Sequence, residues 1–232
     1  MITAILFDKD GTLFDFRATW DVWAGGVLRA LAAGDQGRLA ALAGSIRYDV
    51  DSGQFAPDSP VIAGTNHEVA MRLLPHLAGW AQPELEQYLS ASAARAPLAP
   101  AVPLRPLMEQ LIAMGLRLGV MTNDSEIGAR AHLHSAAVLD LFDFVAGADS
   151  GFGAKPSPAP LLAFAEAVGA VPNQTVMVGD STHDLKAGRA AQMMTVGVLT
   201  GLARGDELAP LADAVLPHIG HLPSWLAARL AA

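Results

Sequence analysis

From residue 104 to its C-terminal end, the sequence alternates between segments with helical periodicity and short, continuous apolar runs. Alternating strands and helices predict parallel βαβ units, whose strands are buried on both faces by helices. The pattern therefore predicts an α/β fold with a Rossmann-like parallel-sheet core. The expected strands are 116–121, 144–146, 175–178, 195–199 and 214–216, with 2–7 at the start of the chain, and the expected helices are 104–114, 125–137, 158–168, 184–192 and a last one from about 221.

The segment that follows the first strand has a different character. Its periodicity indicates helices and no convincing strand. Pro97, Pro100 and Pro103 then form a stiff linker that leads back to the alternating pattern. We therefore expect a core domain of residues 1–14 and 99–232 and an inserted α-helical cap domain of residues 15–98. The helices expected in the insert are 17–33, 36–48, 67–77 and 83–95.

The composition limits the classes of function. Hydrophobic residues make up 52% of the 232 residues and charged residues 16%, which is ample apolar material for a folded core. The net charge of −8 argues against a nucleic-acid partner, because such proteins usually carry a basic stripe. The absence of cysteine excludes disulfides, thiolate zinc sites and cysteine nucleophiles. With no signal peptide and no apolar stretch of about 18 residues, the chain is expected to be cytoplasmic and to have no membrane partner.

Two aspartates one residue apart, Asp8 and Asp10, directly follow the first strand and precede Gly11 and Thr12. Like charges about 4 Å apart repel each other by roughly 4 kcal/mol at an effective dielectric near 20. Such a pair therefore requires a cation or a proton close by, unless the turn is simply solvated. This placement makes the segment a candidate site.

Further polar residues follow later strands. Thr122 and Asn123 end one expected strand, Asp180 ends another, and Lys155 lies in a loop after a third. Because ligands of open α/β sheets bind at the carboxyl ends of the strands, the fold would gather these residues with Asp8 at one edge. Taken alone each is a weak signal, since a threonine often caps a helix or turn and a loop lysine is usually solvated.

Together these segments resemble the four motifs of the haloacid dehalogenase (HAD) superfamily of phosphatases and related hydrolases, in the order of that superfamily. The helical insert after the first motif resembles a C1-type cap, so the resemblance covers the whole chain. The matching residues are Asp8-Lys9-Asp10-Gly11-Thr12 for motif I, Val120-Met121-Thr122-Asn123 for motif II, Lys155 between glycine and proline positions for motif III, and Gly179-Asp180-Ser181-Thr182-His183-Asp184 for motif IV.

The resemblance implies a role for each of these residues. Asp8 would be the nucleophile that forms an aspartyl-phosphate, and Asp10 the general acid and base. Thr122 and Lys155 would complete the catalytic set, with Lys155 neutralising the phosphoryl oxygens and holding the nucleophile in place. The residues expected to bind the substrate are Gly11, Thr122, Asn123 and Lys155.

The resemblance also implies a magnesium ion as cofactor. A buried strand end is a costly place for the charge of Asp180 without a cation, and Mg²⁺ takes few carboxylates and otherwise water or phosphate oxygens. The expected ligands are Asp8, Asp180 and the backbone carbonyl of Asp10. Asp184 is expected to orient a ligand water or Lys155, and it could also be the N-cap of the helix that follows.

Several residues near the expected site have two readings. Trp20 and Trp23 lie three positions apart on an expected helix and could either pack in the cap or contact substrate. His183 could bind the metal, although lone histidines are more often surface or capping groups. Candidates for polar contacts between the cap and the substrate are Arg17, Arg47, His67 and Arg72.

Among the chemistries of the superfamily, hydrolysis of phosphate monoesters fits this sequence best. Dehalogenase members lack the second aspartate, which is present here as Asp10. Phosphonatase members use a cap lysine and sugar phosphomutases typically have one, whereas residues 15–98 contain none. The resemblance therefore implies a magnesium-dependent phosphatase similar to phosphoglycolate phosphatases, a monomer or homodimer whose partner is a small phosphorylated metabolite such as phosphoglycolate.

The sequence departs from the usual motif at two positions, and three alternative functions stay open. Lys9 stands where an apolar or aromatic residue is frequent, and Phe16 follows Asp15 where the superfamily often has serine. Neither change touches an expected catalytic position. A sugar phosphomutase is the alternative within the superfamily, and a phosphoacceptor signalling module or a scaffold protein is the alternative outside it.

Overall fold

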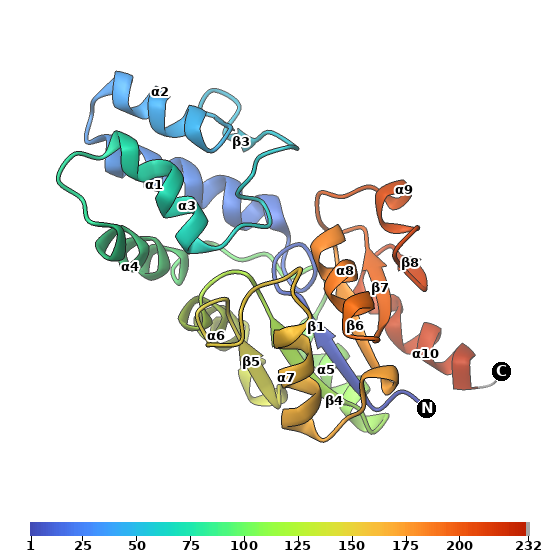
Figure 1. Ribbon diagram of the computed structural model, residues 1–232. Coiled ribbons are helices and arrows are strands. Elements are labelled where there is room, and N and C mark those ends of the chain that lie inside the picture. The colour runs from blue at the N-terminus through green and yellow to red at the C-terminus, as the bar shows by residue number, and fades with distance from the viewer. Residues whose placement is uncertain (231–232) are drawn as a thin grey trace.

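The computed structural model describes residues 1–230. Its centre is a six-stranded sheet with the strand order β5-β4-β1-β6-β7-β8, in which every neighbouring pair is parallel. Figure 1 shows this sheet surrounded by helices, which confirms the predicted α/β class. The strands are β1 (Ala4–Phe7), β4 (Arg117–Met121), β5 (Phe144–Ala146), β6 (Thr175–Gly179), β7 (Met194–Val198) and β8 (Ala214–Leu216).

Helices cover both faces of the sheet, and β1 shows how its side chains divide between them. Ile5 and Phe7 belong to one hydrophobic cluster and Ala4 and Leu6 to the other, since successive side chains of a strand point to opposite faces. Because both faces are buried, the strand is apolar at every position. The first cluster includes α5 (Leu104–Ala113), α6 (Glu126–Ser135) and α10 (Leu222–Leu230), and the second includes α7 (Ala159–Val168) and α8 (Thr182–Ala190), while the short α9 (Gly205–Leu208) precedes β8.

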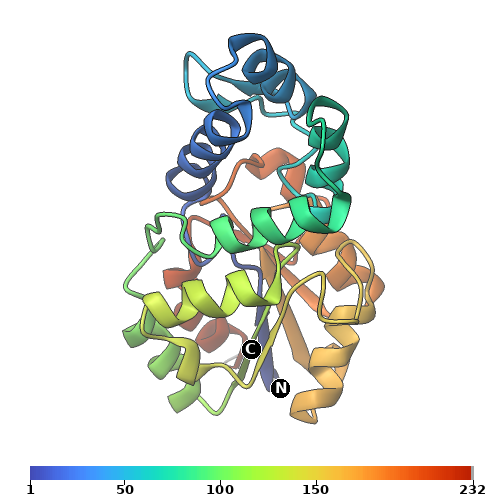
Figure 2. The same ribbon diagram turned by 90° about the vertical axis from the view of Figure 1, so that its left-hand side faces the viewer.

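The inserted segment forms a separate group of helices at the carboxyl ends of the strands, as Figure 2 shows most clearly. Its buried side chains make a hydrophobic cluster of their own, which includes Leu28, Leu42, Leu73 and Leu85. The core domain of 1–14 and 99–232 and the cap of 15–98 stay a prediction, which this separation of clusters supports. The elements of the insert are a π-helix (Arg17–Asp21), α1 (Val22–Ala32), α2 (Gln36–Ser45), α3 (Asn66–Leu73), a 3-10 turn (Leu74–His76) and α4 (Gln82–Ala93).

The expectation that the insert contains no strand is wrong. Two short antiparallel strands, β2 (Tyr48–Asp49) and β3 (Gln54–Phe55), form a hairpin where the helix expected over 36–48 has already ended. The rings of Tyr48 and Phe55 lie edge to face with centroids 5.2 Å apart. Two-residue strands are too short to show a period of two in the sequence, so the sequence does not predict this hairpin. The packing of the two rings holds it together.

The first cap helix also differs from the prediction, because residues Arg17–Asp21 form a π-helical turn before α1 begins. Such turns arise inside helical segments and are frequent near functional sites.

None of the helices in residues 1–230 combines the length and the hydropathy that crossing a bilayer would require.

Candidate active site

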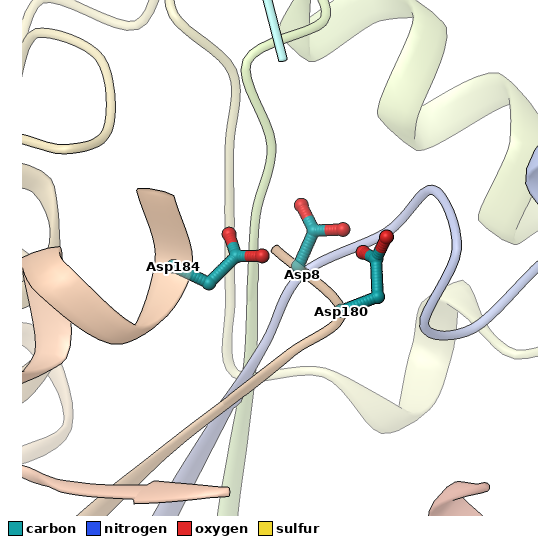
Figure 3. A group of neighbouring side chains, drawn as sticks. All are labelled: Asp8, Asp180 and Asp184. Atoms are coloured by element: carbon teal, nitrogen blue, oxygen red, sulfur yellow. The ribbon is translucent and has the colours of Figure 1, made fainter. Parts of the chain in front are cut away.

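Three buried carboxylates meet at the carboxyl end of the sheet. Strands β1 and β6 are parallel neighbours with Phe7 opposite Val178, so Asp8 and Asp180 follow them at nearly the same level. Asp184 comes from the first turn of α8, and Figure 3 shows the three side chains facing one another. One oxygen from each lies within 4.8 Å of the others, and the residues are only 6%, 7% and 2% exposed.

Lys155 provides the positive charge of this cluster. Its Nζ lies 2.5 Å from Asp8 Oδ1 and 2.7 Å from Asp184 Oδ1, and it donates to the carbonyl of Met121 at 2.9 Å. The buried site thus holds three carboxylates and one ammonium, which contacts two of them. Burial, together with the charges of Asp184 and Asp10, raises the pKa of Asp8 to about 7 against the lowering effect of Lys155.

The same excess of negative charge acts on Asp180, whose pKa is raised by burial and then by the charge of Asp8. Its carboxylate is closely surrounded: Thr12 donates to it at 3.3 Å, and a Cβ on Gly11 or on Gly201 would overlap it. The cluster offers only oxygen donors, it carries excess negative charge, and it is buried. These properties fit a hard divalent cation.

Asp184 is held in place by the start of its own helix. Its Oδ2 accepts from the backbone N–H of Ser181 at 3.0 Å and from the hydroxyl of Ser181 at 2.7 Å, so the two residues form a capping box. The N-cap is therefore Ser181, and the prediction of Asp184 as N-cap is wrong. The other oxygen of Asp184 lies 2.7 Å from Lys155 Nζ, and the expected role of Asp184 in orienting Lys155 or a ligand water stays a prediction.

Asp10 lies beside the cluster, where the chain turns back on itself. The turn depends on Gly11, which has φ of +84° and donates its N–H to the carbonyl of Phe14 at 2.7 Å. Thr122 donates its hydroxyl to Asp10 Oδ2 at 3.4 Å, while Asp10 Oδ1 is buried without a hydrogen-bond partner among the described residues. A buried oxygen of this kind is available for a substrate or a water molecule.

Asn123 joins three parts of the site. Its side-chain amide donates to the carbonyls of Ala63 and Lys155, both at 2.9 Å, and its carbonyl oxygen accepts from the N–H of Lys155 at 2.9 Å. The side chain therefore fixes the Lys155 loop and links it to the cap. A direct contact between Asn123 and substrate stays a prediction.

A second charged cluster, centred on Lys9, was not predicted from the sequence. This lysine is fully buried, and its Nζ lies 2.7 Å from Asp124 Oδ2, 3.3 Å from Asp10 Oδ2 and 2.9 Å from His132 Nδ1. Burial alone would lower the pKa of Lys9, but the charges of Asp10 and Asp124 raise it overall. The available signal was a lysine between two aspartates at a buried strand end, which the sequence analysis treated only as a departure from the motif.

His132 completes this second cluster in its neutral form. Its Nε2 lies 2.7 Å from the carbonyl of Ala93 and must donate there, so its Nδ1 accepts from Lys9. Burial and then the charge of Lys9 lower the pKa of His132. Since Ala93 ends α4, His132 also ties the cap to the core.

A cavity between cap and core contains the two aspartates of motif I. Trp20 and Trp23 both line it, and they also pack against the cap cluster with ring centroids 5.1 Å apart. Their positions therefore fit both expected roles, packing in the cap and contact with substrate. His183 lines the cavity too, but it is not part of the carboxylate group. Among the described residues, the cavity lining includes none of Arg17, Arg47, His67 and Arg72.

Comparisons with known proteins agree with this geometry. The sequence profile of haloacid dehalogenase-like hydrolases matches residues 2–192. A phosphoglycolate phosphatase of Rhodospirillum rubrum is 38% identical over 120 residues, which are 52% of this chain and 50% of that protein. The chain spans about half the length, or less, of the first curated relatives that it matches.

Two solved structures share the fold over nearly all of the chain. CbbY from Rhodobacter sphaeroides in complex with phosphate has a TM-score of 0.75 at 22% identity and covers 96% of both chains. A β-phosphoglucomutase (pgmB) from Clostridium difficile has a TM-score of 0.66 at 20% identity and covers 96% of this chain and 93% of its own. The family profile, the shared fold and the four motifs at one sheet edge lead to one conclusion: this chain belongs to the haloacid dehalogenase-like hydrolase family.

Proposed function

We propose that this protein is a magnesium-dependent phosphatase that hydrolyses a phosphate monoester through an aspartyl-phosphate on Asp8. One observation carries the proposal: Lys155 bridges Asp8 and Asp184 beside the buried carboxylate of Asp180. A buried carboxylate held by a lysine is oriented for attack, and the surplus negative charge requires a cation. The curated relatives named phosphoglycolate phosphatases support the same reaction class.

In the first step, a carboxylate oxygen of Asp8 attacks phosphorus while the bond to the leaving alcohol breaks. Lys155 neutralises charge on the phosphoryl oxygens and holds Asp8 in position. Asp10 donates a proton to the departing alkoxide. The contact from Thr122 to Asp10 holds this carboxyl group near the nucleophile.

In the second step, Asp10 takes a proton from the water molecule that attacks the aspartyl-phosphate. The bond between phosphorus and the Asp8 oxygen breaks, so inorganic phosphate leaves and the carboxylate of Asp8 is regenerated. The two-step path replaces one difficult displacement by two easier ones. Thr122, Lys155, Gly11 and Asn123 are the residues that we assign to phosphate binding.

Magnesium would be held by the carboxylates of Asp8 and Asp180 and by the backbone carbonyl of Asp10. The oxygen-only donor set and the crowding of Asp180 by two glycines fit a small, hard ion. When bound, the ion neutralises the charge that develops on the phosphoryl group. Asp184 keeps its contact with Lys155 in this arrangement.

A sugar phosphomutase is the second candidate within the family, and the structural match to a β-phosphoglucomutase shows the common fold. The missing cap lysine argues against it. The buried, bridged carboxylate argues in the same way against a scaffold protein without activity. Phosphoglycolate as substrate is a prediction from the sequence resemblance alone, and a cytoplasmic location and a monomeric or homodimeric state also stay predictions.

The test is the release of p-nitrophenolate from p-nitrophenyl phosphate, with magnesium and with EDTA. We expect turnover with magnesium, loss of turnover in EDTA and recovery when magnesium is restored. Release of inorganic phosphate without transfer to a sugar phosphate distinguishes a hydrolase from a mutase. An enzyme that is indifferent to chelation would contradict the metal assignment.

A further inference from the structure

We infer that the cap half of the cavity selects a monophosphate whose leaving alcohol is neutral and apolar, and that it disfavours an alcohol with a carboxylate or a second phosphate. This inference rests on the proposed function, and it narrows the substrate to a chemical class. Three observations support it: the cap wall of the cavity is apolar, the basic residues of the cap lie outside the lining, and most charged residues of the lining are carboxylates.

The wall that the cap contributes is apolar. Its large side chains are aromatic and aliphatic, and the tryptophan rings meet edge to face with an interplanar angle of 87°. Aromatic edges and faces of this kind pack well against a hydrocarbon or a ring. The cap residues that define the wall are Phe16, Trp20, Trp23, Phe55, Ile62 and Val69.

The side-chain N–H groups of Asn66 and Trp23 in this wall already have partners, and Trp23 Nε1 donates to the hydroxyl of Ser92 at 3.0 Å. Asn66 donates its side-chain amide to the hydroxyl of Ser90 at 3.0 Å and to Asp124 Oδ1 at 3.3 Å. Both hydrogens of the amide are therefore used in holding the wall to the core. What the wall offers to a substrate is mainly hydrocarbon surface.

The cap's positive charges point elsewhere. The sequence suggested four of them as substrate contacts, but none is among the lining residues of the described structure. Arg72 is exposed on α3, and the other three pair with carboxylates of the cap itself. These pairs are Arg17 with Asp21 at 3.2 Å, Arg47 with Asp58 at 2.8 Å and His67 with Glu86 at 2.7 Å.

The remaining charges of the lining offer an anionic leaving group little positive charge, and the carboxylates of Asp10 and Asp124 are themselves paired with Lys9. Lys155 and His183 are its only residues that can carry positive charge within residues 1–230, and Lys155 already faces two carboxylates. The carboxylates of the lining are Asp8, Asp10, Asp124, Asp180 and Asp184. A substrate carboxylate would lose its water against an apolar wall without gaining a cation, which is unfavourable.

The first experiment compares benzyl phosphate with phosphoglycolate on the full chain with saturating magnesium. Both esters release an alkoxide, so the comparison reports the pocket. We expect kcat/KM for benzyl phosphate to be at least tenfold higher. A smaller ratio, or a preference for phosphoglycolate, would overturn the inference and leave the phosphatase assignment intact.

A binding experiment separates this inference from the proposed function. In 2-phenylethylphosphonate and 3-phosphonopropionate, a CH2 group replaces the ester oxygen of benzyl phosphate and of phosphoglycolate, so neither compound can be hydrolysed. Quenching of the Trp20 and Trp23 fluorescence, or calorimetry, gives their dissociation constants with magnesium. We expect 2-phenylethylphosphonate to bind at least tenfold more tightly than 3-phosphonopropionate, even if no ester is turned over; a smaller difference would refute the selectivity.

A substitution in the wall gives the reverse test. Ile62→Lys adds a cation to the apolar surface, and Ile62→Met is the matched control of similar size without charge. We expect Ile62→Lys to lower the ratio of benzyl phosphate to phosphoglycolate kcat/KM at least tenfold relative to Ile62→Met. An unchanged ratio in a lysine variant with a wild-type thermal unfolding profile would count against the inference.

His183→Gln provides a further check: if it abolishes a preference for phosphoglycolate, the histidine and not the wall selects the substrate.

Discussion

Lys9 Nζ and Asp124 Oδ2 lie 2.7 Å apart in a buried ion pair that joins the turn after β1 to the segment between β4 and α6. Asp10 and His132 contact the same ammonium, and Asn66 of the cap contacts the same aspartate. This second cluster therefore connects the expected acid–base residue, the core and the cap. It lies beside the three-carboxylate site and has no charge partner in common with it.

Replacing Lys9 by methionine should destabilise the protein and slow catalysis. Breaking a buried ion pair leaves an unpaired charge and typically costs about 3–5 kcal/mol. Urea unfolding of Lys9→Met should show a loss of this order, whereas Lys186→Met, which removes an exposed lysine, should have little effect. Adding Asp124→Leu to Lys9→Met should restore part of the stability. If Lys9→Met unfolds like the wild type, the cluster does not hold the fold together.

The neutral state of His132 should make stability depend on pH. Because its pKa in the folded state is lowered from the ordinary value of 6.5, its contribution is fully present above about pH 6.5 and is lost as the pH falls. Lys9, Asp10 and Asp124 are the charged groups that face it. Between pH 7.5 and 5.5, the free energy of unfolding measured with urea should decrease less in His132→Gln than in the wild type.

The control for this pH dependence is His134→Gln, which removes an exposed histidine of the same helix. It should keep the wild-type decrease. If the free energy of unfolding decreases equally with pH in the wild type, His132→Gln and His134→Gln, His132 is not the group that titrates.

Replacing the proposed nucleophile should abolish turnover and preserve the fold. In Asp8→Asn the amide cannot attack phosphorus, so hydrolysis of p-nitrophenyl phosphate should fall below a few per cent of wild type. Asp51→Asn, an exposed change in the β2–β3 turn, is the matched control and should keep full activity. Circular dichroism checks the fold of both variants, and substantial residual activity in Asp8→Asn would refute the assignment.

Removing Asp180 should weaken magnesium binding. Asp180→Ala deletes one of the proposed carboxylate ligands, so the magnesium concentration for half-maximal activity should rise at least tenfold. Magnesium should also raise the Tm of the wild type, because a ligand that binds the folded state stabilises it. This increase should shrink in Asp180→Ala, and an unchanged increase would place the ion elsewhere.

The role of Asp10 should depend on the leaving group. General acid–base help is typically worth about 10² to 10⁴ in rate. Asp10→Asn keeps the backbone carbonyl, so it should leave the magnesium requirement unchanged and slow alkyl phosphates more than aryl phosphates. Nitrophenolate leaves without protonation, so the aspartyl-phosphate should accumulate and can be trapped by acid quenching. Equal losses for both ester classes without a trapped intermediate would assign Asp10 a structural or electrostatic role.

Much of the site could be predicted because its residues follow local patterns. Asp8, Thr122, Lys155 and Asp180 each come after a strand, and parallel strands bring their carboxyl ends to one edge. The boundaries of the longer helices are also local, since their caps and breaks lie within a few residues. Ser181 shows the limit of this reasoning, because the N-cap was expected three residues later at Asp184.

The sequence by itself therefore determined the α/β class, the inserted helices and the residues of the three-carboxylate site. Only the tertiary structure decided the burial of Lys9 against Asp124, residues that are 115 positions apart. It also decided which cap side chains line the cavity: Trp20 and Trp23 do, whereas Arg17 and Arg47 pair with carboxylates of the cap. The physical reason is that periodicity identifies an apolar face within one segment, whereas the partner of a charge is set by the packing of segments distant in the chain.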